Sequence, residues 1–484
     1  GFTVTVNDST PDAGTRTETV NEDGTLTIVL SDEGFQKDPK DPSTKGQIEI
    51  DNGKDGYQTI AKNGTVNIYD GDEIIGTLTN KGNGTLTFKP NADYSKYEAD
   101  NGYLPNFKYK VSDTDGDYAQ GQINIHVKPV ADGTTIKVEN VTTYEDNKNT
   151  QEGQNSVSLG LVQPTIKDNT DKNDTAKGDH GERVYYITLK FTNGASVKGA
   201  VLEKADGTDI ATISNNNQTF KIVIVKDDGS VDTDFHHSNI TLGQSGVVYL
   251  TKEEYEGLKI QHAEDNDTDI VIKILTKTYE VDDSGKPLNA SDSTYADKTN
   301  SHLSKTTTAN MTVIIKPVTD DIELTFDNAT VNGEVLGTID GKTFVFKNEI
   351  IKEEGIINFK ELLTNTSGTT DGKNGTKKGD LDGSEIRWYT VKFEGNSKDH
   401  PDYLIINGKT VSLSNGEYKY EFTTNENKQA DPDFKVQFPN GYSGGILRGE
   451  LTLHVQDRGV EEKDDSNNWG NELTQTVKFE VAVN

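Results

Sequence analysis

The sequence has 484 residues but contains no cysteine and only one methionine, Met311. The absence of cysteine excludes disulfide bonds, thiolate metal sites and a cysteine nucleophile. Because Met311 is internal and no targeting segment is recognisable, we expect the sequence to be a piece of a longer chain. No apolar run approaches the ~20 residues that a membrane-spanning helix needs, so we expect no membrane insertion.

Positive charge is also scarce. The 49 lysine and arginine residues are outnumbered by 80 aspartate and glutamate residues, which gives a formal net charge of −31. A surface this negative repels phosphate backbones and anionic lipids, so nucleic-acid and membrane-surface partners are not expected. Part of the charge has the simpler interpretation of a well-solvated surface.

Apolar residues make up only 31% of the chain, but their arrangement indicates strands. Apolar and polar residues alternate in short runs such as Thr3–Val6, Gly121–Val127 and Leu451–Val455, which is the period of a strand with one buried face. Between such runs lie Gly, Asn, Asp, Ser and Thr, which favour turns. Only Lys252–Leu258 and Ile357–Leu363 have the pattern of a helical turn or two. The sequence therefore predicts an all-β protein.

A long internal repeat organises these strands. Pro129–Asp132 (Pro-Val-Ala-Asp) recurs as Pro317–Asp320 (Pro-Val-Thr-Asp), and each follows an alternating run, Ile123–Val127 and Met311–Ile315. Proline cannot donate a ladder hydrogen bond, so each repeat is expected to end its strand and begin a short connector. The last predicted strand, Val477–Val481, stops where a third connector would begin.

Other elements recur in the same register, which predicts three homologous β-sandwiches in tandem. The matching segments are Thr85–Ser95 with Phe434–Ser443, Tyr185–Phe191 with Arg387–Phe393, and the acidic turns Val20–Gly24, Thr143–Asp146 and Ile351–Gly355. We predict domain boundaries at 1–132, 133–320 and 321–484.

The motifs at 21–27 (Asn-Glu-Asp-Gly-Thr-Leu-Thr), 84–95 (Gly-Thr-Leu-Thr-Phe-x-Pro-x-x-x-Tyr-Ser) and 111–117 (Val-Ser-Asp-Thr-Asp-Gly-Asp), with Pro-Val-x-Asp, carry a family resemblance. The chain resembles the cadherin-like and immunoglobulin-like extender region of giant bacterial RTX adhesins, which are secreted by type I systems. In units two and three the resemblance is to longer repeats, with Asp380–Glu385 as the clearest signature, from which Asp171–Glu182 departs.

The resemblance covers all three units and implies tandem immunoglobulin/cadherin-like sandwiches in an elongated array. It also implies secretion to the bacterial cell surface, with a role in cell adhesion or biofilm formation. The absence of cysteine suits a chain that is secreted unfolded. The Gly-Gly-x-Gly-x-Asp calcium repeats of the family are missing, which fits an internal segment.

Acidic residues cluster around glycine turns, and calcium is the cofactor that this pattern indicates. Such turns contain Asp113, Asp115 and Asp117 in the first unit, and Asp380, Asp382 and Glu385 in the third. Ca²⁺ takes six to eight oxygen ligands, which such a turn can supply in part. No helices flank these turns, so they are not EF-hands. The alternative interpretation is that Asp and Gly simply favour turns.

Strand order in a sandwich should bring the acidic turns, the connectors and the loops of the next unit together at each junction. The first junction would gather Glu22, Asp23 and Asp132 with Asp168, Asp171, Asp174 and Asp282. The second would gather Glu145, Asp146, Asp320 and Asp321 with Asp380, Asp382, Glu385 and Asp465. Bound Ca²⁺ would turn the repulsion among these carboxylates into attraction and stiffen the linkers.

No catalytic constellation is present in the sequence, and we do not expect an enzyme. Gly441–Gly445 matches the G-x-S-x-G nucleophile motif, but that motif needs an α/β sheet, and Tyr94–Ser95 holds the equivalent place without the glycines. His236–His237 is the one close histidine pair, for which a solvated loop is the default interpretation over a transition-metal site.

The two tryptophans are the remaining candidates for ligand binding. In Arg387–Phe393 the buried face is expected to hold Tyr389, Val391 and Phe393. Trp388 then faces the other way, where a sugar or peptide could stack on it. Tyr186 holds the same position in unit two, which favours a structural role instead. Trp469 lies in a loop, where functional residues concentrate.

These patterns lead to one main hypothesis and two alternatives. The chain is expected to be a monomeric, calcium-rigidified spacer that contacts neighbouring domains of the same adhesin through calcium-bridged linkers. Alternatively, unit two or three is itself a module that binds a host or bacterial surface glycan or peptide. The extra length of unit two would then be an inserted binding subdomain. A third interpretation, a surface-layer or filament subunit, predicts self-assembly.

Overall fold

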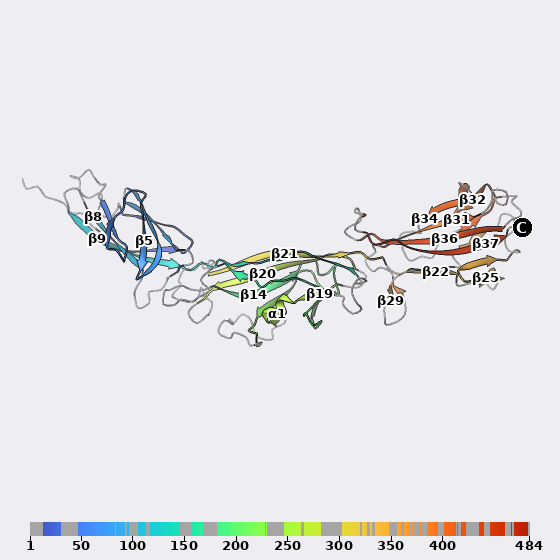
Figure 1. The fold of residues 1–484 in the computed structure, drawn as a ribbon, viewed down its shortest axis with the longest axis horizontal. Helices are drawn as coiled ribbons and strands as arrows, with labels where there is room; N and C mark the ends of the chain where they lie inside the picture. Colours follow the sequence, from blue (N-terminus) through green and yellow to red (C-terminus); the bar gives the residue numbers. More distant parts are fainter. Residues whose placement is uncertain are drawn as a thin grey trace, which may run out of the picture.

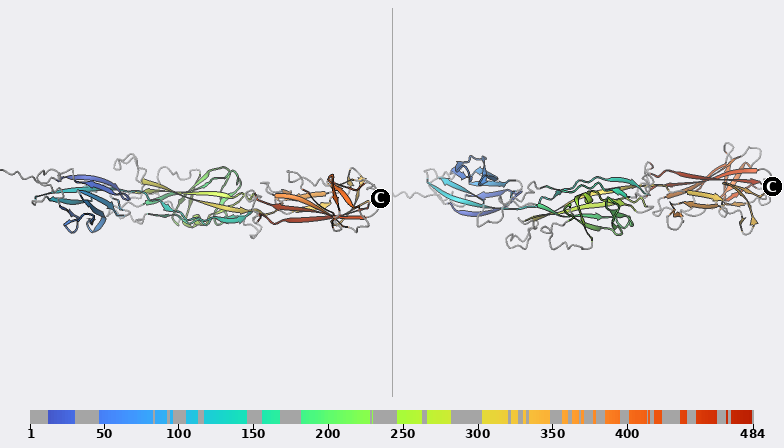
Figure 2. Two further views of the ribbon diagram at one scale, coloured as in Figure 1. Left: turned by 90° about the horizontal axis from the view of Figure 1, so that it is seen from above. Right: turned by 60° about the horizontal axis from the view of Figure 1, so that its bottom comes forward.

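The structure is a computed structural model. It describes residues 13–30, 47–82, 84–91, 94–95, 105–112, 117–145, 156–167, 182–227, 229, 246–262, 266–281, 303–319, 322–326, 330–331, 334–347, 356–359, 363–367, 369–370, 377–378, 385–394, 401–412, 414, 418–422, 435–439, 446–459, 466 and 469–482. Three groups of β-sheets follow one another along the chain and lie end to end in an elongated array (Figure 1), and the two other views agree (Figure 2).

The first sandwich pairs a five-stranded sheet, in the order β1-β9-β8-β3-β4, with a four-stranded sheet, in the order β2-β7-β6-β5. Its strands are β1 (Thr15–Asn21), β2 (Leu26–Val29), β3 (Gln47–Asp51), β4 (Tyr57–Thr59), β5 (Thr65–Asp70), β6 (Glu73–Gly82), β7 (Thr85–Pro90), β8 (Asn106–Ser112) and β9 (Tyr118–Lys128). β1 runs parallel to β9, whereas the other ladders are antiparallel.

The second sandwich has a six-stranded sheet, in the order β11-β21-β20-β14-β17-β18, and a four-stranded sheet, in the order β12-β19-β15-β16. Its elements are β10 (Thr134–Thr135), β11 (Val141–Tyr144), β12 (Ser156–Ser158), β13 (Thr165–Ile166), β14 (Glu182–Phe191), β15 (Val201–Glu203), β16 (Asp209–Thr212), β17 (Gln218–Ile224), β18 (Val247–Leu250), α1 (Lys252–Glu256), β19 (Lys259–Gln261), β20 (Ile270–Glu280) and β21 (Ser304–Lys316). β10 and β13 form a separate pair.

The third sandwich has a six-stranded sheet, in the order β25-β26-β37-β36-β31-β34, and a four-stranded sheet, in the order β27-β35-β32-β33. Its strands are β22 (Ile322–Phe326), β23 (Thr330–Val331), β24 (Glu334–Val335), β25 (Gly337–Asp340), β26 (Thr343–Phe346), β27 (Ile356–Asn358), β28 (Leu363–Ser367), β29 (Thr369–Thr370), β30 (Lys377–Lys378), β31 (Glu385–Glu394), β32 (Tyr403–Ile406), β33 (Lys409–Ser412), β34 (Tyr418–Phe422), β35 (Lys435–Gln437), β36 (Ile446–Asp457) and β37 (Leu473–Ala482). β22 pairs with β28, β23 with β24, and β29 with β30.

Each sandwich has its own hydrophobic core, which explains why the array is modular. One large cluster of buried side chains lies in each of the three groups of sheets, around Phe88, Leu189 and Phe393 respectively. Alternate residues of the long strands point into these cores, as the alternating burial along β20 shows. The predicted fold class, all-β tandem sandwiches of the immunoglobulin/cadherin type, is confirmed. The boundaries at 1–132, 133–320 and 321–484 stay a prediction.

The repeated elements occupy equivalent places. β9 ends at Lys128 and β21 ends at Lys316, each immediately before the proline that was expected to stop it. β14 lies between β20 and β17, and β31 lies between β36 and β34. The ladder from β14 to β17 starts at Ile187, and the ladder from β31 to β34 starts at the corresponding Tyr389. Units two and three therefore share the order of five strands in the larger sheet, and they differ in the edge strand, which is β18 in unit two and β25 in unit three.

One of the two predicted helical segments is right and the other is wrong. Lys252–Leu258 contains α1, which begins with a capping box between Thr251 and Glu254. In Ile357–Leu363, by contrast, Ile357 pairs with Val436 in a strand, and only Phe359 of its described residues has a 3₁₀ conformation. The β-branched Ile356 and Ile357 suit a sheet better than a short helix. No helix in the described ranges is long and apolar enough to span a membrane.

Candidate functional site

The candidate site is the pair of junctions between successive sandwiches. The described residues include Glu22, Asp23, Asp117, Asp132, Glu145 and Glu385 of the predicted calcium ligands. The others lie outside the described residues, and their predicted role is untested: Asp113, Asp115, Asp146, Asp168, Asp171, Asp174, Asp282, Asp320, Asp321, Asp380, Asp382 and Asp465. The predicted strand Thr3–Val6 is outside them as well.

At the first junction, Glu22 binds the linker that leaves its own sandwich. β1 runs parallel to β9, with Asn21 opposite Lys128, so both strands end at the same side of the sandwich. The Glu22 backbone N–H donates to the carbonyl of Lys128 at 3.0 Å. The buried Glu22 carboxylate accepts a hydrogen bond from the backbone N–H of Val130. The start of the sandwich is thereby tied to its exit connector.

The second junction repeats this arrangement. β11 runs parallel to β21, with Tyr144 opposite Lys316. Glu145 is 2% exposed, and its Oε1 accepts a hydrogen bond from the backbone N–H of Val318 at 2.6 Å. Val130 and Val318 are the second residues of the two Pro-Val-x-Asp repeats. At both linkers, the backbone N–H of the valine in this repeat therefore donates a hydrogen bond to a glutamate carboxylate.

Glu182, at the start of β14, holds the first linker from the other side. Its side chain is 1% exposed and accepts hydrogen bonds from the backbone N–H groups of Asp132, at 3.1 Å, and Gly133, at 2.9 Å. Gly133 has a φ of +83°, a conformation that favours glycine. The linker amides are therefore bound by a glutamate of the preceding sandwich and by one of the following sandwich.

The electrostatic setting of Glu182 is unfavourable for its negative charge. Burial raises the pKa of Glu182 above its ordinary value of 4.5, and the negative charge of Asp132 raises it further. Hydrogen bonds from Thr278, Gly133 and Asp132 act in the opposite direction. The buried Glu280 lies directly opposite Glu182 in the β14–β20 ladder. Carboxylates thus collect at this end of the second sandwich.

The sequence analysis missed the roles of Glu182 and Glu280, although a signal for them existed. Glu182 pairs across the sheet with Glu280, and Glu385 pairs with Asp457 at the corresponding place in the third sandwich. Glu385 was a predicted ligand because of its acidic turn. The segment Asp171–Glu182 ends in a glutamate, as Asp380–Glu385 does, and matching these two ends would have placed Glu182 at the position of Glu385.

At the second junction, the following sandwich contacts the linker through Thr319. The Thr319 hydroxyl accepts a hydrogen bond from the buried backbone N–H of Asp457 at 3.0 Å. A Cβ atom on Gly470 would lie 2.7 Å from Thr319 Oγ1, so only glycine allows this close approach. The neighbouring Trp469 ring stacks under the Arg458 guanidinium, 4.5 Å from its centroid. Trp469 therefore lies beside the junction, and its predicted ligand role is untested.

Trp388 lies on the outer face of its sheet, as predicted. Tyr389, Val391 and Phe393 are buried in the core. The Trp388 ring stacks on His454, with centroids 5.1 Å apart and planes at 10°. His454 contacts Thr390 at 2.8 Å through Nε2 and Glu472 at 2.7 Å through Nδ1. This network gives Trp388 a structural role, and the predicted ligand role is untested.

The donor chemistry at the junctions suits a hard cation, although the described part of the chain does not complete a site. Carboxylate and backbone carbonyl oxygens are the ligands that Ca²⁺ prefers. Within the described ranges, no group of three or more His, Asp or Glu side chains is placed to hold a metal ion. The carboxylates of Glu22, Glu145 and Glu182 instead hold backbone amides of the linkers.

Comparisons with known proteins identify no family for the chain. No protein-family profile matches it, and no curated protein does. Among solved structures, mouse cadherin-23 EC22–24 matches with 12% identity and a TM-score of 0.26 over 99% of both chains. Protocadherin gamma B2 cadherin domains 3–6 match with 12% identity and a TM-score of 0.25, over 97% of this chain and 72% of that one.

Sidekick-1 immunoglobulin domains 1–4 match with 7% identity and a TM-score of 0.20, over 96% of this chain and 74% of that one. Scores and identities this low say nothing about what the chain binds. The fold assignment rests on the strand topology and the three cores described above.

Proposed function

We propose that the chain is a calcium-rigidified structural segment of a secreted bacterial surface adhesin. It would project ligand-binding domains away from the cell for adhesion or biofilm formation, and it would not be an enzyme. The observation that carries this proposal is the buried glutamate that holds the linker at equivalent places in both junctions, Glu22 at Val130 and Glu145 at Val318. An end-to-end array with fixed linkers suits a spacer (Figure 1).

Calcium would act on the carboxylates that gather at each linker. Glu22, Asp23 and Asp132 would supply oxygen ligands at the first junction, and Glu145 would do so at the second. The remaining ligands would come from the predicted acidic residues outside the described ranges. When bound, the ion supplies positive charge that cancels the repulsion among the carboxylates. This repulsion is strongest between buried carboxylates, because the local dielectric constant is low.

The linkers are also constrained without an ion. A hydrogen bond between a charged carboxylate and a backbone amide contributes about 1.5–3 kcal/mol. The first linker has such bonds at Val130, Asp132 and Gly133. Calcium would therefore stiffen a joint that is already ordered, and its removal would soften the linker without releasing the sandwiches completely.

Small-angle scattering and calorimetry on the whole chain test this proposal. We expect the maximum dimension to shorten and the melting temperature to fall when EGTA removes calcium, and both changes to reverse when Ca²⁺ is restored. Magnesium at the same concentration is the control, because it demands a tighter octahedral site. Scattering curves and melting temperatures that are identical with and without Ca²⁺ would contradict the proposal.

The alternative, a module that itself binds a glycan or peptide, is favoured by one separate observation. The second sandwich contains a crevice of about 480 Å³ between its strands.

A further inference from the structure

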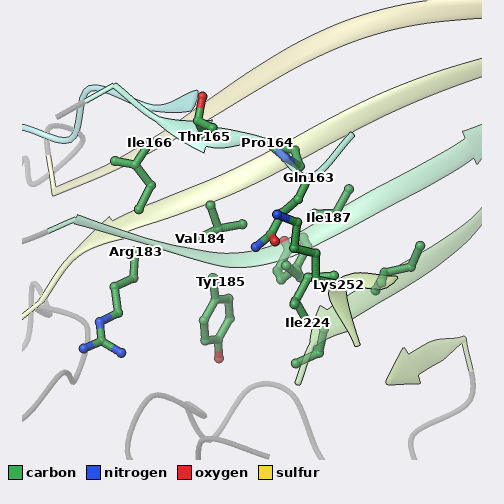
Figure 3. A pocket seen from close by; sticks show the side chains of 13 residues that line it. Gln163, Pro164, Thr165, Ile166, Arg183, Val184, Tyr185, Ile187, Ile224 and Lys252 are labelled. Atoms are coloured by element: carbon green, nitrogen blue, oxygen red, sulfur yellow. The ribbon is translucent and has the colours of Figure 1, made fainter. Parts of the chain in front are cut away.

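The crevice lies on the second sandwich, between residues 163–166 and strands β14 and β17 (Figure 3). Its volume of about 480 Å³ is within the range of protein ligand sites, which is roughly 300–1,000 Å³. Its lining residues Thr165 and Ile166 pair with Thr135 and Thr134 beside the first linker, but the hydrogen bonds described above for that linker are made by other residues.

A fork in the sheet produces the crevice. The ladder between β14 and β17 begins at Ile187, opposite Ile222, and β14 is irregular between Val184 and Tyr186. Beyond the fork, Val223 and Ile224 pair with β18 and are not paired with β14 in the described ladders. Two strand edges therefore diverge on either side of the opening, and residues of both strands line it.

The floor of the crevice is apolar and continuous with the core. Ile187 and Ile222 are each 1% exposed members of the core, and the partly buried Val184 and Ile224 pack against it. All four line the opening, together with Ile166 across from β14. In Figure 3, Val184 points toward the segment that carries Ile166, whereas Tyr185 points away. An aliphatic side chain entering here would extend the core.

The rim carries positive charge, although the chain as a whole has a formal net charge of −31. Arg183 and Lys252 both line the crevice and lie on opposite sides of Val184 in Figure 3. The Lys252 side chain is 60% exposed, and its Nζ lies 4.0 Å from the Glu256 carboxylate. Acidic groups are therefore the ligand groups that this rim complements.

We propose that the crevice binds an extended peptide by strand addition at the fork, with an aliphatic side chain on the floor and acidic side chains toward Arg183 and Lys252. Alternate side chains of a strand point to opposite faces, so a sequence that alternates aliphatic and acidic residues meets both requirements. Backbone hydrogen bonds supply affinity in this mode of recognition, and the side-chain pocket supplies selectivity. The proposal does not depend on calcium or on the spacer function.

The test measures binding of a fluorescent peptide of alternating valine and glutamate to the whole chain in calcium buffer, by fluorescence polarisation. We expect saturable binding. A peptide with N-methyl groups on alternate backbone nitrogens keeps the side chains but loses ladder donors, so it should bind at least about tenfold more weakly, a difference of ~1.4 kcal/mol. A peptide with lysine in place of glutamate should also lose binding.

Two pairs of variants locate the site. Thr165→Trp fills the crevice from an exposed lining position and should abolish binding, whereas Val162→Trp, at an exposed position outside the lining, should not. Arg183→Glu should weaken binding at least about tenfold, and Lys198→Glu, on an exposed turn elsewhere in the sandwich, should leave it unchanged. Thermal melts check that each variant folds. If Thr165→Trp does not fold, the Arg183→Glu variant locates the site instead.

Absence of saturable binding to the unmodified chain would overturn the proposal. Equal binding of the N-methylated peptide would overturn strand addition, and equal binding by Thr165→Trp and Arg183→Glu would place the peptide elsewhere. All of these binding measurements are made with calcium present and do not use its effect on the linkers. They therefore test the crevice separately from the proposed calcium-rigidified spacer.

Discussion

Replacing Glu182 with alanine gives a quantitative test of how the first linker is held. The buried N–H of Gly133 would lose both carboxylate oxygens, which lie at 2.9 and 3.2 Å. An unsatisfied buried donor costs about 1–3 kcal/mol. The half-buried N–H of Asp132 regains water, so its loss is smaller, about 0.5–1.5 kcal/mol. Removing a carboxylate that is buried beside Asp132 offsets part of both costs.

We therefore expect Glu182→Ala to lower the free energy of unfolding of the second sandwich by about 2 kcal/mol. For a domain of this size, that corresponds to a fall in melting temperature of roughly 4–8 °C. Differential scanning calorimetry of the whole chain in EGTA measures it. The control is Glu139→Ala, an exposed glutamate in the same segment, which should change stability by less than ~0.5 kcal/mol. Equal effects of the two substitutions would refute the reasoning.

Three further predictions concern the junctions. Glu145→Gln removes the charged acceptor of the Val318 N–H and should cost about 1–2 kcal/mol in calorimetry, and an unchanged melt would show that this bond contributes nothing. Because burial raises the pKa of Glu182 above 4.5, the folded chain holds that proton more tightly than the unfolded chain. In EGTA, the contribution of Glu182 to the free energy of unfolding should be present below pH 4.5 and lost as the pH rises through the folded-state pKa. Urea titrations at several pH values should therefore show a flatter dependence of stability on pH for Glu182→Ala, and the same pH dependence in both proteins would contradict this prediction. Gly470→Ala puts a Cβ atom 2.7 Å from Thr319 Oγ1 and should cost about 1–3 kcal/mol and alter the scattering curve, whereas an unaltered curve and melt would mean that the linker does not pack as described.

Much of the fold follows from local sequence patterns. Alternation in Ile123–Val127 predicts a strand, and Pro129 predicts its end, because both depend only on neighbouring residues. The two faces of Arg387–Phe393 follow from the strand period in the same way, which is why Tyr389 was correctly assigned to the core and Trp388 to the outer face. Repetition along the chain predicts the tandem array.

The missed features depend on tertiary pairing. The partners of Glu182 are backbone amides 49 and 50 residues away in sequence, and no side-chain motif reports them. The pattern of Ile357–Leu363 favours a helical turn, whereas in the structure Ile357 pairs with Val436, which is distant in sequence, and lies in a sheet. The crevice arises from an irregularity in β14 and from where its ladder to β17 begins, and neither leaves a residue signature.

The most direct measurement of the central claim is a crystal structure of the whole chain grown with abundant Ca²⁺, with anomalous data to locate the ions. We expect an ion at each junction, with oxygen ligands at about 2.3–2.6 Å that include carboxylates of Glu22 and Asp132 at the first and of Glu145 at the second. Ordered junctions whose carboxylates contact only the linker amides and solvent, with no ion between them, would contradict a calcium-rigidified spacer.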